Sequence, residues 1–142
     1  MPLTDCPLIE CSNGVFRPIL GIRIINPHTG LSQRTIGIID TGADECAVPA
    51  SYAKILGHKL TAGKRKTVST GNGKTRAYTH TTKIEIFDPT TGKIAYVVND
   101  TPIDFMPNLS VVLLGVESFL SKFILNIDYP HRKFSIKSPV KL

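Results

Sequence analysis

The segment Ile38-Ile39-Asp40-Thr41-Gly42-Ala43-Asp44 places a carboxylate after an apolar run and directly before a tight turn. Moving an ionisable group into such surroundings costs desolvation free energy, so a purely structural sequence seldom has one there. We therefore expect Asp40 to have a function. The alternative is an aspartate that caps the turn by accepting backbone hydrogen bonds, because Asp-Thr-Gly alone supports that role and arises by chance in roughly a few per cent of chains this long.

The residues before Asp40 predict a β-hairpin. From Phe16 to Ile25, apolar residues recur with the period of two that indicates a strand. The next five residues, Asn26-Pro27-His28-Thr29-Gly30, have turn composition, because proline presets φ and glycine accepts a positive φ. A second strand is expected from Arg34 to Ile39, and it ends at Asp40.

The residues after the motif predict a short helix and a second hairpin. Pro49 suits the first position of a helix that runs through Leu56 and ends at Gly57. The segment from Thr67 to Tyr78 is rich in residues that favour extended structure and contains Gly71-Asn72-Gly73. It is predicted to be a hairpin with a flexible tip.

The second half of the chain repeats this pattern. Strands are expected at Tyr78 to Phe87 and Ile94 to Val98, joined by Asp88-Pro89-Thr90-Thr91-Gly92, which shares the form x-Pro-x-Thr-Gly with the earlier turn. An apolar strand from Val111 to Gly115 and a short helix from Val116 to Phe123 should follow. Two related units of roughly fifty residues each are thus indicated.

A last hairpin is predicted from Ile124 to Ile136, around a turn at Tyr129-Pro130-His131-Arg132. The whole pattern of short extended segments and turns is typical of an all-β domain. With 142 residues, 42% of them hydrophobic and 20% charged, the chain fits a single folded domain.

Composition argues against several other classes of protein. The segment from Met1 to Leu20 is interrupted by acidic residues and prolines, so no signal peptide is expected, and no apolar run reaches the length of a membrane helix. The cytoplasm is the expected compartment. Three cysteines and four histidines show no metal-ligand spacing, so reduced thiols and no metal site are expected.

The formal net charge of +6 raises the question of a nucleic-acid partner. Six basic residues cluster locally: Lys59, Lys64, Arg65, Lys66, Lys74 and Arg76. No nucleic-acid-binding motif accompanies them, so a solvated loop is the favoured interpretation and nucleic acid is not expected as a partner. A basic rim that attracts acidic segments of a peptide is a further alternative.

In motif order and spacing, the chain from about Phe16 to Lys137 resembles the retroviral-type aspartic proteases, the retropepsin family. Asp40-Thr41-Gly42-Ala43-Asp44 matches the catalytic motif, Gly71-Asn72-Gly73 lies where the family has its flap, and Leu113-Leu114-Gly115 matches the apolar-apolar-Gly element near the site. The ending around Leu120 to Tyr129 is more similar to cellular and bacterial members than to viral ones.

The resemblance implies a closed all-β acid-protease barrel with one or two short helices, working as a symmetric homodimer. Asp40 would be the single catalytic carboxylate of each chain, acting on a protein or peptide without cofactor or metal. Thr41 and Gly42 would support the active-site loops, and Gly42, Ala43, Asp44, Gly71, Asn72 and Gly73 would border the substrate. Leu114 and Gly115 would be structural neighbours, and Val68 and Tyr78 are candidates for the flap, the pocket wall or the core.

Two departures from the family pattern shape these expectations. Viral members have an arginine after the second glycine motif, where this chain has Val116 and Glu117, so apolar contacts from the terminal hairpin are expected to hold the dimer. Residues 1–15 form an N-terminal arm before the protease domain at 16–142, and could be flexible, an interface strand or a propeptide-like segment. The alternative function is a catalytically inactive peptide-binding or dimerisation module with the same fold.

Overall fold

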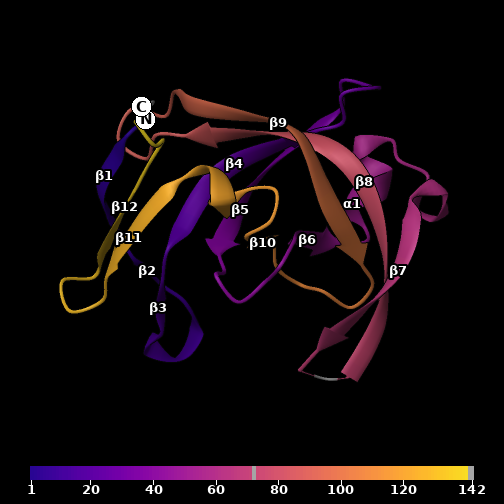
Figure 1. The fold of residues 1–142 in the computed structure, drawn as a ribbon, viewed down its shortest axis with the longest axis horizontal. Coiled ribbons are helices and arrows are strands. Elements are labelled where there is room, and N and C mark those ends of the chain that lie inside the picture. The colour runs from indigo at the N-terminus through magenta and orange to yellow at the C-terminus, as the bar shows by residue number, and fades with distance from the viewer. Residues whose placement is uncertain (72, 141–142) are drawn as a thin grey trace.

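The computed structural model describes residues 1–71 and 73–140, so the predicted flap residue Asn72 lies outside the described residues. Strands dominate the described chain (Figure 1). In chain order they are β1 (Leu3–Pro7), β2 (Ile9–Glu10), β3 (Phe16–Arg17), β4 (Ile19–Ile25), β5 (Ser32–Ile39), β6 (Cys46–Pro49), β7 (Lys64–Thr70), β8 (Gly73–Phe87), β9 (Ile94–Met106), β10 (Leu113–Leu114), β11 (Ile124–Asp128) and β12 (Lys133–Lys137). One short α-helix, α1 (Tyr52–Leu56), and 3₁₀ turns at Ser12–Gly14, Leu60–Ala62 and Leu120–Lys122 complete it.

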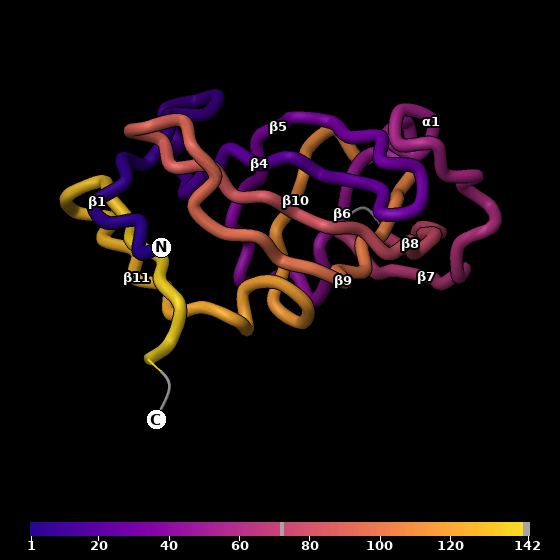
Figure 2. The backbone as a smooth tube through the Cα atoms, turned by 90° about the horizontal axis from the view of Figure 1, so that it is seen from above, coloured from indigo at the N-terminus to yellow at the C-terminus, as the bar shows by residue number. Residues whose placement is uncertain are grey.

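Seven strands form the main sheet in the order β4-β5-β10-β6-β9-β8-β7. The neighbours β5 and β10 are parallel, as are β6 and β9, whereas β10 and β6 are antiparallel. The long strand β8 pairs with β9 and, through residues 83–86, also with β4, so the series of pairings returns to its first strand. A separate sheet, β1-β12-β11, lies at the end of the molecule opposite the β7–β8 hairpin (Figures 1 and 2).

The sheet bears out the internal repeat, because β4, β5 and β6 are related to their neighbours as β8, β9 and β10 are to theirs. The two turns agree in atomic detail. Gly30 and Gly92 have φ of +76° and +71°, and each donates its N–H to the carbonyl of the first turn residue at 2.8 Å. Each first residue, Asn26 or Asp88, also accepts a backbone N–H two positions on through Oδ1. The x-Pro-x-Thr-Gly pattern therefore specifies one turn structure used twice.

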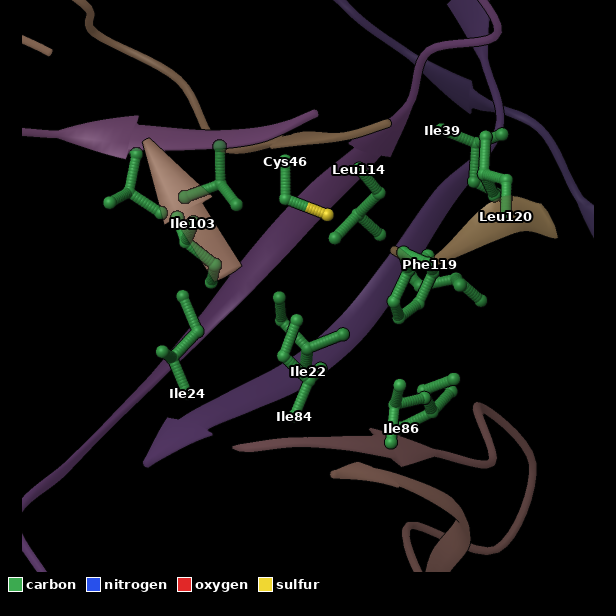
Figure 3. Packing of buried hydrophobic residues seen from close by; sticks show 14 of the residues in the cluster. Ile22, Ile24, Ile39, Cys46, Ile84, Ile86, Ile103, Leu114, Phe119 and Leu120 are labelled. Carbon is green, nitrogen blue, oxygen red and sulfur yellow. The ribbon is translucent and has the colours of Figure 1, made fainter. Parts of the chain in front are cut away.

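The core lies between the two repeated units. Ile22 and Ile24 of β4 are the cross-strand partners of Ile86 and Ile84 of β8, and all four side chains are fully buried (Figure 3). Leu3, Cys6 and Leu8, from the N-terminal segment, are buried in the same cluster. Burying such side chains contributes about 1.5–3 kcal/mol each, and it fixes the frame that carries the site.

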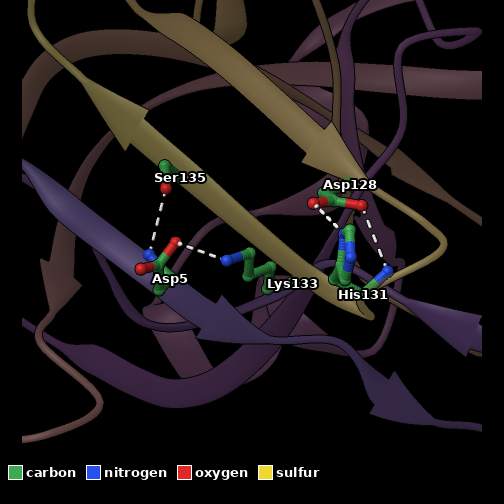
Figure 4. Close-up of polar contacts among 5 residues, drawn as sticks. All are labelled: Asp5, Asp128, His131, Lys133 and Ser135. Carbon is green, nitrogen blue, oxygen red and sulfur yellow. Dashed lines mark hydrogen bonds and ion pairs between the residues drawn. The ribbon is translucent and has the colours of Figure 1, made fainter.

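The terminal hairpin is confirmed as β11 and β12, and β1 pairs with β12 on its other side. Polar contacts reinforce the β1–β12 pairing and the turn between β11 and β12 (Figure 4). The backbone N–H of Asp5 donates to Ser135 Oγ at 3.0 Å, and its carboxylate lies 3.5 Å from Lys133 Nζ. In the turn, His131 donates its backbone N–H to the Asp128 carboxylate, and its ring Nδ1 lies 2.7 Å from the second oxygen. This hydrogen bonding holds the pKa of Asp128 below its usual range.

Predicted elements differ from the structure in several places. The strand expected from Ile94 to Val98 continues as β9 to Met106, and the apolar strand expected from Val111 to Gly115 is reduced to β10. The strand expected from Phe16 to Ile25 is divided at Pro18, whose carbonyl accepts the N–H of Ile39. Pro49 ends β6 instead of beginning the helix, which starts at Tyr52. The helix expected over Val116 to Phe123 is reduced to a 3₁₀ turn: the N–H groups of Leu120 and Ser121 donate to carbonyls five residues back, instead of the four of an α-helix. Within the described chain, no helix is long and apolar enough to cross a membrane.

Candidate active site

Asp40 is placed by the end of a buried strand and by its parallel neighbour. β5 ends at Ile39, and the N–H of Asp40 donates to the carbonyl of Leu114 at 3.0 Å. Two residues earlier, Ile38 donates to Val112 at 2.9 Å, so the backbone before and at the aspartate is hydrogen-bonded. Leu114 is itself buried and packs on Gly37, where an added Cβ would lie 2.8 Å from the leucine side chain.

The turn after Asp40 orients its carboxylate through backbone hydrogen bonds. The N–H of Gly42 donates to Asp40 Oδ1 at 3.0 Å, and the N–H of Ala43 donates to the Asp40 carbonyl at 3.2 Å. A Cβ on Gly42 would lie 3.3 Å from the same Oδ1, so glycine at this position leaves space beside the carboxylate. The turn-capping role considered from the sequence is thus present, and it fixes the orientation of a carboxylate that also borders a cleft.

Gly115 packs closely against the loop that follows Asp40. A Cβ there would overlap the carbonyl oxygen of Glu45 and lie 2.8 Å from that of Ala43, so a side chain at this position requires the backbone to shift. The next two N–H groups, of Val116 and Glu117, donate to Ala43 and Asp44 at 2.9 and 2.7 Å. We call residues 40–45 together with 113–117 the floor, since each segment holds the other through backbone contacts.

A cleft of about 690 Å³ lies between the floor and the β7–β8 hairpin, which we call the flap. It brings together five of the predicted site residues: Asp40, Gly42, Ala43, Asp44 and Gly71. The flap candidate Val68 also lines it. The other lining residues are Glu45, Ala47, Lys66, Thr67, Ser69, Thr70, Asp104, Met106, Leu109 and Leu113.

The remaining predicted residues lie beside or behind the cleft. Gly73 has φ of +103° and pairs with Thr70 at the described end of the flap, whereas Tyr78 lies further down β8, opposite Arg65. Leu114 and Gly115 are not among the residues that line the cleft. Leu114 accepts the N–H of Asp40, and Gly115 packs against the loop that follows it. Thr41 is exposed and borders a second hollow of about 280 Å³ with Ile127 and Tyr129 of the terminal hairpin.

Sequence reasoning missed two charged residues of the cleft, Glu45 and Asp104. Asp104 is 4% exposed, and its carboxylate accepts the Thr79 hydroxyl at 3.0 Å and lies 2.9 Å from Lys66 Nζ. Glu45 accepts the Ser118 hydroxyl at 3.4 Å. The available signal was the run Ile103-Asp104-Phe105-Met106, which places a charge inside an apolar strand, as happens at Asp40.

Burial shifts the pKa of two groups beside the loop. It raises the pKa of Glu45, Asp104 raises it further, and Lys66 opposes the rise. Burial also raises the pKa of the Cys46 thiol to about 12, so this thiol stays protonated at neutral pH. Among the residues that the structure describes, no group of three or more His, Cys, Asp or Glu could hold a metal ion.

Comparison with known proteins agrees with this arrangement. The family model of the gag-polyprotein putative aspartyl proteases matches residues 32–122, which include the floor, the flap and Asp104. The chain belongs to this aspartyl protease family. The retropepsin-like family expected from the sequence, with bacterial relatives, is thereby confirmed.

A solved structure shows the same fold in a bacterial protein. The chain is similar to the crystal structure of a retropepsin-like aspartic protease from Rickettsia conorii, with a TM-score of 0.63 and 20% sequence identity. The match covers 96% of this chain and 91% of the Rickettsia chain, so the aspartyl protease fold extends over nearly all of both. No curated protein matches the chain.

Proposed function

We propose that the chain is one half of an aspartic endopeptidase, and that Asp40 is its catalytic carboxylate. The observation that carries this proposal is the position of Asp40: it ends a buried strand, its backbone and one oxygen are held by hydrogen bonds, and its side chain borders a cleft under a hairpin. A cleft with an oriented carboxylate, in a chain of an aspartyl protease family, is best explained by peptide-bond hydrolysis.

The mechanism requires two such carboxylates in contact. Two carboxyl groups in contact cannot both ionise at low cost, because their negative charges repel. The pair therefore shares one proton, as is known for aspartic-protease dyads. The ionised member takes a proton from a bound water, which attacks the scissile carbonyl, and the protonated member donates to the developing oxyanion. The two groups exchange roles when the amine leaves. The mechanism needs no cofactor, metal or covalent intermediate.

We propose that the second carboxylate comes from a second copy of the chain. The sequence contains one Asp-Thr-Gly. Leu114-Gly115, the place where the sequence suggests a second motif, has no Asp, and β9, the counterpart of β5 in the second repeated unit, ends at Met106 before Pro107, so one chain cannot complete the pair. A two-fold axis beside Asp40 would bring both copies together. The exposure of Thr41 next to Ile127 and Tyr129 supports an interface there, with Thr41 linking the two loops and the terminal hairpins supplying apolar contact.

The remaining site residues take roles from their positions in the cleft. Gly42, Ala43 and Asp44 would bind the substrate backbone, and the flap from Gly71 to Gly73 would open to admit a peptide and close to exclude water. In the active unit, each chain would supply the acid-protease barrel, and the pairing of β8 with both β9 and β4 supports its closure. Residues 1–15 would be an arm attached to the domain at 16–142, anchored by β1 on β12.

A subunit-mixing experiment tests the proposal. Wild type and Asp40→Asn are co-refolded in equal amounts and assayed on denatured casein from acid to neutral pH. With random pairing, about a quarter of the dimers carry two carboxylates, so activity per wild-type subunit should fall to about half. It should also fall on dilution below the dimer dissociation constant. Asp40→Asn alone should fold and show no cleavage, while Asp44→Asn should weaken binding or dimerisation.

Three results would contradict this function. Equal activity of Asp40→Asn and wild type would remove the assignment of the catalytic residue. An inactive wild-type chain that still binds peptides would favour the non-catalytic module. Unchanged specific activity in both the mixing and the dilution series would show that a single chain is sufficient.

A further inference from the structure

The cleft has the opposite charge to the rest of the protein. Four carboxylates line it, those of Asp40, Asp44, Glu45 and Asp104, and among the described lining residues Lys66 is the one cation. The chain as a whole carries a formal charge of +6. The acidic groups are therefore concentrated at the place where a ligand would enter, where the cleft walls focus their field.

The basic residues of the flap do not change this balance. Lys64, Arg65, Lys74 and Arg76 are exposed, and of the described flap cations only Lys66 borders the cleft. The ammonium of Lys66 lies 2.9 Å from Asp104, so its charge is already compensated. An acidic ligand group would have to approach this pair among three other carboxylates. The basic rim suggested by the sequence therefore faces outward, and the cleft itself disfavours anions.

Asp104 is a charge that the fold does not need. It belongs to the parallel pair β6–β9, opposite Ala47, and lies between the buried side chains of Ile103 and Phe105 in sequence. Replacing a buried ion pair by apolar residues of similar volume is often neutral or stabilising, so stability does not explain its presence. A buried carboxylate whose counter-ion comes from the flap is better explained by ligand binding.

Part of the cleft lining is apolar and lies beside the acidic groups. Ala47, Met106, Leu109 and Leu113 form a continuous apolar wall next to the acidic groups, with Val68 of the flap packed against it. A ligand that fits both parts has an apolar side chain and, close to it, a cation. This is the chemistry of a peptide with lysine or arginine beside an aliphatic or aromatic residue.

We propose that the cleft selects peptides with a lysine or arginine, whose cationic end lies between Glu45 and Asp104 while a neighbouring apolar side chain packs on Met106 and Leu113. This inference rests on the proposed function, since it names the substrate class of the same cleft. Lys66 occupies the cation position of Asp104 in the unliganded chain and competes with the ligand for it.

A binding experiment separates this inference from catalysis, because it uses the full-length Asp40→Asn chain and measures no turnover. The probes are fluorescein-labelled octapeptides of apolar residues in which a single lysine, norleucine or glutamate is moved along the sequence. At one position, lysine should bind roughly tenfold more tightly than norleucine, and glutamate should bind more weakly than either.

Three further changes test the named residues. In the Asp40→Asn background, Glu45→Gln and Asp104→Asn should each reduce the preference for lysine to about twofold or less, since each removes one charge. Lys66→Met should increase the affinity for the lysine peptide. The matched control is Glu10→Gln, which removes the same charge from an exposed glutamate of β2 and should leave the preference unchanged. Asparagine at 104 still accepts the Thr79 hydroxyl, and Glu45→Gln decides the matter if Asp104→Asn fails to fold.

The outcomes distinguish the two proposals. Peptides that bind without preference for lysine, or a preference that survives Glu45→Gln, would overturn the inference while cleavage by wild type upholds the proposed function. Selective binding by Asp40→Asn together with an inactive wild type would uphold the inference and overturn catalysis. If none of the peptides binds, the inference is wrong whatever wild type does to casein.

Discussion

The floor and the flap border the same cleft, but different forces hold them. In the floor, backbone groups of residues 40–45 contact those of 113–117, and Gly115 leaves no space for a side chain. The flap is held mainly by the β7–β8 pairing, and a Cβ at Gly71 or Gly73 would meet no atom within 4 Å. The proposed catalytic group thus stands on the closely packed part, and the proposed lid has space around its tip.

The largest expected effect of a single change is at Gly115. Gly115→Ala should lower the free energy of unfolding by about 3 kcal/mol or more, because its Cβ would meet backbone carbonyls that cannot move without the whole floor. Urea unfolding followed by circular dichroism measures this. A loss below about 1 kcal/mol would show that the floor is not rigid.

Gly37→Ala should have an intermediate effect. Its Cβ would meet the side chain of Leu114, which can shift in part, so a loss of about 1–3 kcal/mol is expected. The matched control is Gly21→Ala on the adjacent strand β4, where nothing lies within 4 Å, and the change there should stay within about 0.5 kcal/mol. Equal effects at the two positions would refute the role of Leu114 in supporting the floor.

The flap should respond in turnover more than in stability. Replacing Gly71 and Gly73 together by valine restricts the backbone at the hairpin tip, where Gly73 has a positive φ, and should lower kcat/KM roughly tenfold or more. The thermal midpoint should fall much less than in Gly115→Ala. Peptide cleavage at the wild-type rate would mean that this hairpin is not the lid.

The smallest effect concerns the base of the flap, where the rings of His58 and His80 lie 4.4 Å apart. Burial, together with the charges of His80 and His28, lowers the pKa of His58, and in the described chain its Nε2 is buried without a hydrogen-bond partner. As pH falls through 6.5, the unfolded chain binds a proton that the folded chain does not, so stability is lost on the acid side.

His58→Phe should remove part of this loss, because phenylalanine does not titrate. Unfolding midpoints measured from about pH 8 to about pH 5 would show a flatter profile than wild type. His131→Phe, at an exposed site of the terminal hairpin, is the comparison that should not flatten it. Identical slopes for His58→Phe and wild type would exclude a role for His58.

Local sequence determined much of this protein. The two x-Pro-x-Thr-Gly segments predicted turns that have the same hydrogen bonds, because proline and glycine restrict φ wherever they occur. Period-two patterns located most strands, and the motif at Asp40, with the order of the elements after it, led to the correct family.

Tertiary structure decided the rest. The segment after Gly115 has a helical pattern, but Leu120 and Ser121 donate to carbonyls five residues back instead of four. The segment's first N–H groups also bond to the floor loop, which is distant in sequence, and no local pattern shows either feature. The same reason hid the acidic cleft: Glu45, Lys66 and Asp104 come from three separate segments, and only the β6–β9 and β7–β8 pairings bring their charges together. Local preferences depend on neighbours in sequence, whereas long-range hydrogen bonds and the charge of a cleft depend on neighbours in space.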